Sequence, residues 1–470
     1  MDNLFSSIMW FFGWTITIYM LIVIGFYTFL LGLSLFQIRK EHRLDKQESH
    51  DDYLQDDFVK PVSILVPAFN EEAGVIESVR SLVSLKYPET EIIVVNDGST
   101  DQTLSVIIEE FHMEKIDKVI RKQLECEEIR GVYQSAILPH LLLVDKVNGG
   151  KADALNAGIN VSKYPYFCSI DGDSILENDS LLKVMKPIIH SDGEVIASGG
   201  SIRIANGCEI ELGSVLKVGL SRNPLVVMQV IEYLRAFLMG RVGLSRHNML
   251  LIISGAFSVF SKKWAIEAGG YSKHTVGEDM ELVVRIHGLI RKRKLKKRIE
   301  FVADPVCWTE APDTLKTLQR QRSRWHRGLL ESLWTHKNMT LNPRYGLVGT
   351  VAFPYFWFVE LIGPIVELGG YLFVLLSFFL GEMYVEMAIL LLLLMVVYGS
   401  LFSMMSVLLE VWSMNQYPRV RDVMKLYFYS MLESFWYRPL TVIWRCEGIL
   451  QWLVKYRGWD KNERKGISKL

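Results

Sequence analysis

The stretch Tyr166-Phe-Cys-Ser-Ile-Asp-Gly-Asp173 joins a short apolar run to two carboxylates. Such a run is typical of a strand buried on both faces, and Asp-Gly is a common turn at its end. Three further apolar runs precede it, at 62–67, 91–96 and 140–144, with helical patterns between them at 71–84 and 101–117. Apolar strands that alternate with helices predict an α/β fold with a mostly parallel sheet.

Each of these four strands ends in a polar cluster. The clusters are Ala68-Phe-Asn-Glu71, Asn96-Asp-Gly98, Lys146 to Lys151 and Asp171-Gly-Asp173. Because parallel sheets bind ligands beyond the carboxyl ends of their strands, we expect one shared crevice. A pair of carboxylates suits a hard divalent cation, although Asp-Gly-Asp is also an ordinary turn.

Two of the clusters leave alternatives open. Asp97 either belongs to a turn and helix cap or accepts a hydrogen bond from a base or a ribose hydroxyl. Asn148-Gly-Gly-Lys151 precedes a helix, where backbone amides attract phosphate and two glycines permit close approach. The same four residues also suit a plain glycine-rich turn between a strand and a helix.

Two later segments carry further candidate chemistry. Glu278 and Asp279 precede a helical pattern from Met280 to His287. Acidic residues are favoured at a helix start by the helix dipole, whereas the functional interpretation is a general base. Arg324 lies in a helix predicted over 314–334, which suits either an amphipathic membrane-surface helix or a clamp on a departing diphosphate.

The composition indicates membrane segments joined to a globular part. Half of the 470 residues are apolar, 22% are charged and the mean hydropathy is +0.19, which excludes a disordered or fibrous chain. Basic and acidic residues number 52 each, so there is no basic excess for nucleic-acid binding. Five scattered cysteines exclude a disulfide framework and a zinc site, and suit the reducing cytosol.

Charge placement predicts the membrane topology. Residues 3–38 contain no ionisable side chain except Tyr, which is long enough for a span. Arg39 and Lys40 follow this run, so we expect the N-terminus outside and the catalytic domain in the cytoplasm of a multi-pass cell-membrane protein. No Lys or Arg occurs from Tyr345 to Pro418, and two or four spans are expected there. The basic run from Arg291 to Arg298 is either a solvated helix end or a contact with anionic lipid headgroups.

These patterns divide the chain into six parts. They are an N-terminal transmembrane helix (1–38), a cytoplasmic linker (39–60), a catalytic domain (61–313), an amphipathic interfacial helix (314–345), a C-terminal membrane region (346–445) and a cytoplasmic basic tail (446–470).

Taken in order, these elements resemble membrane-embedded family 2 glycosyltransferases of the processive type, which includes cellulose, hyaluronan and poly-N-acetylglucosamine synthases. The resemblance runs from Pro61 to Trp325 and rests on the acidic motifs together with Gln321-Arg-Ser-Arg-Trp325. Tyr437-Arg-Pro-Leu440 and the segment 458–465 look like the poly-N-acetylglucosamine branch. Gly277 stands where cellulose-synthase-like members carry Thr, which puts the identity of the acceptor in doubt.

The resemblance implies a GT-A fold, a nucleotide-sugar donor that is usually UDP-linked, and a divalent metal, Mg²⁺ or Mn²⁺. The site residues that it implies are Ala68, Phe69, Glu71 and Asp97 for the uridine, Lys151 near the diphosphate, Asp171 for the nucleotide, Asp173 for the metal, Asp279 as the base with Glu278 beside it, Gln321, Arg324 and Trp325 for diphosphate and acceptor, and Ser254, Gly255 and Ala256 for the acceptor subsite.

The expected function is therefore inverting transfer of a sugar onto a growing polysaccharide at the cytoplasmic membrane face, coupled to export. The expected partners are the donor, a polysaccharide or lipid acceptor and the bilayer, without nucleic acid; the sequence names no accessory subunit. Alternatives are a non-processive transferase acting on a lipid acceptor, a nucleotide-binding transporter or receptor, and a nucleotidyltransferase.

Overall fold

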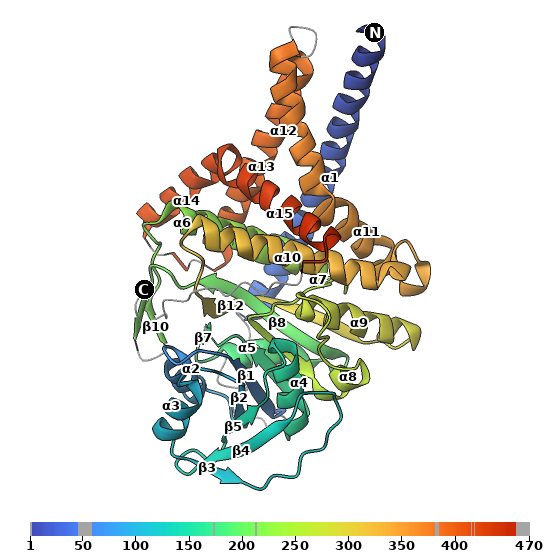
Figure 1. Ribbon diagram of the computed structural model, residues 1–470. Helices are drawn as coiled ribbons and strands as arrows, with labels where there is room; N and C mark the ends of the chain where they lie inside the picture. Colours follow the sequence, from blue (N-terminus) through green and yellow to red (C-terminus); the bar gives the residue numbers. More distant parts are fainter. Residues whose placement is uncertain are drawn as a thin grey trace.

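The globular part of the molecule is built around a mixed sheet (Figure 1). The computed structural model describes residues 2–45, 59–172, 174–211, 214–380, 385–414, 416–417 and 419–456. Among these residues the main sheet has ten strands in the order β3-β4-β5-β2-β1-β6-β11-β8-β12-β7. Their bounds are β1 Val62–Ala68, β2 Thr90–Asp97, β3 Met113–Ile116, β4 Ile129–Ser135, β5 Leu141–Lys146, β6 Tyr166–Ile170, β7 Ser174–Leu176, β8 Val195–Ile204, β11 Phe257–Ser261 and β12 Arg298–Thr309; β9 Glu209–Glu211 and β10 Ser214–Lys217 form a separate pair.

Most strands of this sheet point the same way, as predicted. β5, β2, β1 and β6 pair in parallel, as do β8 and β12, whereas β4, β11 and β7 run in the opposite direction. β1, β2 and β5 are buried almost throughout, which explains their unbroken apolar sequences. The third predicted strand was placed at 140–144, and the structure extends it to Lys146.

Helices connect the strands and pack on the sheet. Their bounds are α2 Val75–Val83, α3 Thr103–Glu110, α4 Lys151–Val161, α5 Ser180–His190, α6 Pro224–Leu234, α7 Val242–Ser245, α8 Lys262–Glu267, α9 Glu278–Lys292 and α10 Leu315–Thr335. α4 packs on β1 and β2, and α5 packs on β8 and β12. The Thr314 hydroxyl accepts a hydrogen bond from the Thr317 amide at 3.3 Å, which caps α10 close to its predicted start.

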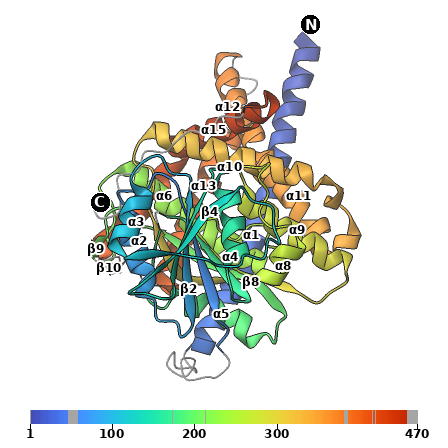
Figure 2. The ribbon, with the colours of Figure 1, turned by 60° about the horizontal axis from the view of Figure 1, so that its bottom comes forward.

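Three helical segments of the described chain are long and apolar enough to cross a bilayer: Met9–Lys40, Val348–Phe379 and Val385–Ser413. The elements of this part are α1 Asp2–Asp45, η2 Arg235–Arg241, η3 Lys337–Met339, η4 Pro343–Tyr345, η5 Val348–Ala352, α11 Phe353–Tyr355, η6 Phe356–Leu361, α12 Gly363–Leu380, α13 Val385–Ser413, α14 Val420–Leu432, η8 Glu433–Phe435 and α15 Tyr437–Leu453. Figures 1 and 2 both show α10 lying between the sheet and α12. The segment 458–465 lies outside the described residues.

Buried ion pairs join the globular part to the C-terminal helices. Arg203 of β8 pairs with Glu410 of α13 at 2.5 Å, and both side chains are almost fully buried. Arg235 of η2 pairs with Glu433 at 2.9 Å, and that carboxylate is also buried. A buried charge without its partner is costly, so the two parts must fold together.

Candidate active site

The carboxyl ends of four adjacent parallel strands place the predicted polar clusters along one edge of the sheet. The loop after β1 is bonded to the loop after β2, because the Glu71 amide donates to the Thr103 hydroxyl at 2.9 Å and the Asn70 amide donates to the Ser99 hydroxyl at 3.1 Å. A Cβ atom on Gly172, just after β6, would lie 3.9 Å from Glu71 Cγ. The polar segments that follow β1, β2 and β6 therefore lie next to one another.

The clearest convergence is around the Lys151 ammonium at the first position of α4. It pairs with Asp171 at 2.6 Å and with Glu278 at 3.3 Å, and it lies 3.4 Å from the Gly255 carbonyl oxygen. Asp279 Oδ2 lies only 3.0 Å from the position of a Cβ on Gly255. Segments more than a hundred residues apart in sequence thus contribute one cation and three carboxylates to one place.

The charges of this cluster depend on one another. Burial disfavours the charged form of Lys151, but the carboxylates of Asp171, Glu278 and Asp279 hold the pKa of its ammonium above the ordinary value. Burial raises the pKa of Glu278; Lys151 opposes this shift, and the adjacent Asp279 adds to it. Glu278 therefore retains a proton more readily than an exposed glutamate does.

The predicted acceptor segment borders this cluster. Gly255 has no room for a side chain, because its Cβ would meet Asp279 Oδ2 at 3.0 Å and Lys151 Nζ at 3.6 Å. The Ala256 carbonyl accepts a hydrogen bond from the Asp171 amide at 3.2 Å, and its own amide donates to the Ser254 hydroxyl at 3.2 Å. Segment 254–256 thus lies against the carboxylate of the predicted base Asp279 and is bonded to the backbone of Asp171, the predicted nucleotide residue.

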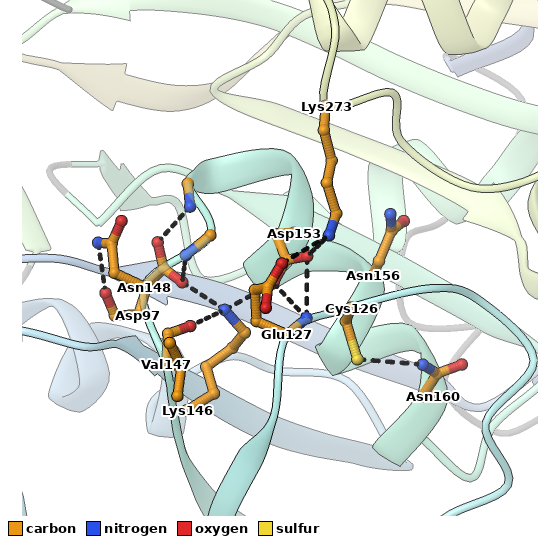
Figure 3. Close-up of polar contacts among 12 residues, drawn as sticks. Asp97, Cys126, Glu127, Lys146, Val147, Asn148, Asp153, Asn156, Asn160 and Lys273 are labelled. Atoms are coloured by element: carbon orange, nitrogen blue, oxygen red, sulfur yellow. Dashed lines mark hydrogen bonds and ion pairs between the residues drawn. The ribbon is translucent and has the colours of Figure 1, made fainter.

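Asp97 is buried and bonded within the chain. The Gly149 amide donates to its Oδ1 at 3.0 Å, the Gly150 amide donates to Oδ2 at 2.7 Å, and Lys146 pairs with Oδ1 at 2.5 Å (Figure 3). Gly98 makes this approach possible: its φ is +65°, and a Cβ there would lie 2.7 Å from the Asn148 amide nitrogen. Asp97 therefore fixes the turn that presents Lys151, and its predicted contact with uridine stays a prediction.

Near this turn, the sequence analysis placed Lys146 in a polar cluster but did not predict its burial, and it missed Asp153 and Lys273. Lys146 is completely buried and pairs with Asp153 at 2.6 Å as well as with Asp97. Asp153 is also completely buried, pairs with Lys273 and accepts two 3.1 Å hydrogen bonds from the Glu127 amide (Figure 3). The sequence signal for Lys146 is weak, because Asp145 separates it from the apolar run and it was assigned to the polar cluster after the strand.

Close packing of two glycines positions the acidic pair of α9. A Cβ on Gly277 would lie 3.1 Å from backbone atoms of Gly328 in α10, and a Cβ on Gly328 would lie 2.9 Å from Gly277 N. Glu331, one turn further along α10, accepts hydrogen bonds from the Thr275 hydroxyl at 3.0 Å and the Val276 amide at 2.9 Å. This contact gives a physical reason for glycine at 277: α10 leaves no space for a side chain.

The α10 motif lies on the helix that makes this contact. Trp325 is 44% exposed, and its ring lies 4.3 Å from the buried Arg322 guanidinium and 6.4 Å from the Tyr233 ring. Arg322 pairs with Glu232 of α6 at 2.7 Å, and the Gln321 side-chain oxygen accepts a hydrogen bond from Arg322. Gln321 and Arg324 are partly buried. Arg322, which was not predicted, thus anchors the motif, while Trp325 remains available to a ligand.

The predicted nucleotide and metal residues differ in exposure. Ala68 is buried, whereas Phe69 is 39% exposed at the strand end. Asp173 lies outside the described residues. Within the described ranges, no group of three His, Cys, Asp or Glu side chains is arranged to hold a metal ion. Three carboxylates around one ammonium carry excess negative charge, but Asp171 and Glu278 are both paired with Lys151.

Arg241 at the end of η2 is a further cation that the sequence analysis missed. Its guanidinium lies 4.1 Å from the Phe237 ring, and its buried Nε has no hydrogen-bond partner among the described residues. Burial lowers the pKa of Arg241 to about 10, and the negative charge of Asp279 opposes this shift. Arg241 thus adds positive potential on the Asp279 side of the cluster.

Comparison with known families agrees with this arrangement. The model of "Glycosyltransferase like family 2" matches residues 60–328, and the model of chitin synthase matches residues 274–447. A mannosyltransferase from Pyrobaculum calidifontis, solved in complex with GDP-Man and Mn²⁺, covers 93% of this chain and 100% of its own with a TM-score of 0.50. Their sequences are 15% identical, so this likeness shows the fold alone.

Curated relatives with similar sequences are bacterial. The poly-β-1,6-N-acetyl-D-glucosamine synthase of Staphylococcus epidermidis is 28% identical over 59% of this chain and 57% of its own length. The protein of the same name from Staphylococcus aureus strain COL is 27% identical over 64% of this chain and 61% of its own. The matched part therefore spans less than two thirds of these relatives.

Proposed function

We propose, from the premise that this chain belongs to the glycosyltransferase-like family 2, that it transfers a sugar from a UDP-linked donor onto a growing polysaccharide at the membrane. The observation that carries the proposal is the meeting of Lys151 with Asp171 and Glu278, with Asp279 beside Gly255, at the carboxyl ends of parallel strands. The names of the bacterial relatives support N-acetylglucosamine as the sugar and a polymer as the product.

In this reaction the acceptor hydroxyl attacks the anomeric carbon from the face opposite the diphosphate. The new bond from oxygen to the anomeric carbon forms as the bond from that carbon to the diphosphate breaks, and UDP leaves with the bonding pair. Asp279 accepts the hydroxyl proton, which typically contributes a factor of about 10²–10⁴. Inverted configuration at the anomeric carbon follows from this geometry.

The surrounding residues orient the reactants and stabilise the leaving group. Lys151 provides a positive charge that stabilises the diphosphate, and its position is fixed by Asp171 and by the turn bonded to Asp97. Arg324 of α10 provides a second positive charge. Asp171 and, from the sequence, Asp173 would hold a divalent metal, which when bound neutralises charge on the diphosphate. Segment 254–256 keeps the acceptor hydroxyl close to Asp279.

The membrane helices support the cellular setting. Three apolar segments of the described chain are long enough to span, and α10 lies between the sheet and α12. The proposal places the catalytic part on the cytoplasmic face and the N-terminus outside, because basic residues follow the first apolar run. Each added sugar would then enter a polymer that leaves through the membrane part.

The test uses the purified full chain in detergent with a panel of UDP-sugars and Mg²⁺ or Mn²⁺. We expect UDP release with UDP-N-acetylglucosamine and a labelled product of high mass. A product with a single added sugar would favour a lipid acceptor and refute processive synthesis. Nucleotide binding without UDP release from any donor would favour the transporter or receptor alternative.

The role of Asp279 is tested separately. Asp279→Asn should lower transfer by at least about 100-fold and leave UDP binding largely intact, because the amide cannot accept the proton. Asp117→Asn, at an exposed aspartate of the loop after β3, is the matched control and should keep full activity. Substantial turnover by the Asp279 variant would show that this carboxylate is not the base.

A further inference from the structure

A basic hollow lies at the opposite end of α9 from the acidic pair. It has a volume of about 510 Å³, and its lining comes from the end of α9, the start of β12 and the η4 turn. The basic side chains that line it are Arg291, Lys294, Lys296, Lys297, Arg298 and Arg344. The only acidic residue of the lining is Glu194.

Within the described residues, most of these cations form no ion pair. Arg298 pairs with Glu300 at 2.9 Å, and Lys297 donates to the Gly193 carbonyl at 2.6 Å. In the part of the chain that the structure describes, Arg291, Lys294, Lys296 and Arg344 form no ion pair, and the buried Nε of Arg291 has no hydrogen-bond partner. Like charges gathered in this way repel one another, and an anion in the hollow would relieve the repulsion.

Helix-end effects do not account for the arrangement. Cations in the last turn of a helix are favoured by its dipole, which explains Arg291 but not the residues beyond the helix or Arg344. Lys294 has a φ of +55°, and the Leu295 amide donates to the Ile290 carbonyl at 3.0 Å, so Lys294 occupies the left-handed position that follows a helix. Glycine is strongly preferred there, and a lysine at this position costs conformational energy. The protein therefore carries a charged side chain at 294 where an uncharged glycine would be less strained.

The hollow lies close to the ends of two apolar segments. Pro343, Arg344 and Gly346 line it, and Val348 is the first residue of the second candidate span. On another side Asn248 lines it, and Arg246, two residues earlier, donates to the Gln37 side chain near the end of the first candidate span at 3.5 Å. A ligand in the hollow would therefore lie at the membrane surface.

We infer that this hollow binds the phosphate group of an anionic phospholipid headgroup. Clusters of four to eight basic residues beside a membrane span attract anionic lipids, and arginine and lysine donors match phosphate oxygens. The position beside two spans favours a lipid over a free phosphate compound. Neither the sugar donor nor the acceptor is involved, so the site is independent of the transfer reaction.

The experiment measures binding of short-chain lipids to the detergent-purified full chain by native mass spectrometry. Dioctanoyl phosphatidylglycerol is the probe, and dioctanoyl phosphatidylcholine and inorganic phosphate are the comparisons. We expect phosphatidylglycerol to bind preferentially, with an affinity that falls as salt rises. Equal binding of the two lipids would overturn the inference, and so would phosphate that competes as well as the lipid, because the ligand would then be a soluble anion.

Charge removal tests the residues. The triple variant Lys294→Gln/Lys296→Gln/Arg344→Gln should weaken phosphatidylglycerol binding by about 100-fold, since each basic residue near an anionic surface contributes about fivefold. The matched control Lys86→Gln/Lys122→Gln/Lys263→Gln removes three exposed lysines elsewhere and should bind as the wild type does. Wild-type affinity in the first variant would overturn the inference.

A single variant separates binding from folding. Lys294→Gly removes the charge but places glycine where the left-handed backbone favours it. We expect an unchanged or higher melting temperature together with weaker lipid binding. Unchanged lipid binding in this folded variant would show that the Lys294 charge does not contact the ligand.

Discussion

Gly328→Ala should impair catalysis far more than folding. An alanine Cβ at 328 would lie 2.9 Å from Gly277 N and 3.0 Å from its Cα, whereas ordinary contact begins at 3.4 Å. Backbone atoms cannot rotate away as side chains do, so α10 and the loop before α9 must separate by about 0.5 Å, the difference between 3.4 and 2.9 Å.

Gly328→Ala has one stabilising and one destabilising effect on folding, and the two partly cancel. Alanine in place of glycine favours the helix by about 1 kcal/mol, and overpacking typically costs about 1–3 kcal/mol. The net loss is therefore at most about 2 kcal/mol. The displacement reaches Asp279, two residues after Gly277, and a 1 Å error in catalytic geometry can cost about 100-fold. A shift of half that size predicts a loss of about tenfold in turnover.

The assay compares UDP release per folded molecule with the melting temperature of the same sample. Gly288→Ala is the matched control, because it lies within α9 and its Cβ would meet only Met339 Sδ at 3.8 Å, an ordinary contact. We expect the control to keep wild-type turnover. Full turnover by Gly328→Ala would refute the idea that this glycine contact sets the position of the base, and so would an equal loss in both variants.

Three further predictions concern single side chains. Asp97→Ala should destabilise the protein by roughly 3 kcal/mol, measured by chemical unfolding, because it removes one partner of the buried Lys146; weaker UDP binding at unchanged stability would instead favour a ligand role. His287 is bonded at 2.8 Å to the Leu250 carbonyl, and burial lowers its pKa to about 4. Between about pH 6.5 and pH 4 the unfolded chain therefore binds a proton that the folded chain does not. As the pH falls through this window, the free energy of unfolding should decrease by about 3 kcal/mol. His287→Gln should lose this part of the pH dependence, and an unchanged profile would contradict the assignment. Asp173→Ala should weaken metal-dependent UDP binding, and equal UDP affinity with and without metal in the wild type would argue against a metal role.

The central sheet could be predicted because its strands are apolar on both faces. β1, β2, β5 and β6 were all located from short apolar runs. β8 was missed because it contains two glycines, two serines and Arg203, and β12 because it contains Asp304 and Pro305. In both strands, pairing with neighbours distant in sequence outweighs the weak local preference.

The site was predicted as far as strand ends and short motifs reveal it. Lys151, Asp171 and Glu278 were identified from their positions next to strands and helices, and the structure brings them together. Arg241 and the burial of Lys146 were missed, because burial of a cation depends on elements that pack from elsewhere in the chain. Local sequence contains no information on such partners.

The ion pairs between the globular part and the last helices affect the order of events during synthesis. Glu410 and Glu433 are translated 207 and 198 residues after their partners Arg203 and Arg235. Until the two glutamates leave the ribosome, the guanidinium groups of Arg203 and Arg235 lack their counter-ions. The nascent chain therefore reaches its finished form only after Glu410 and Glu433 have been translated, and a product truncated before Glu410 would lack both counter-ions.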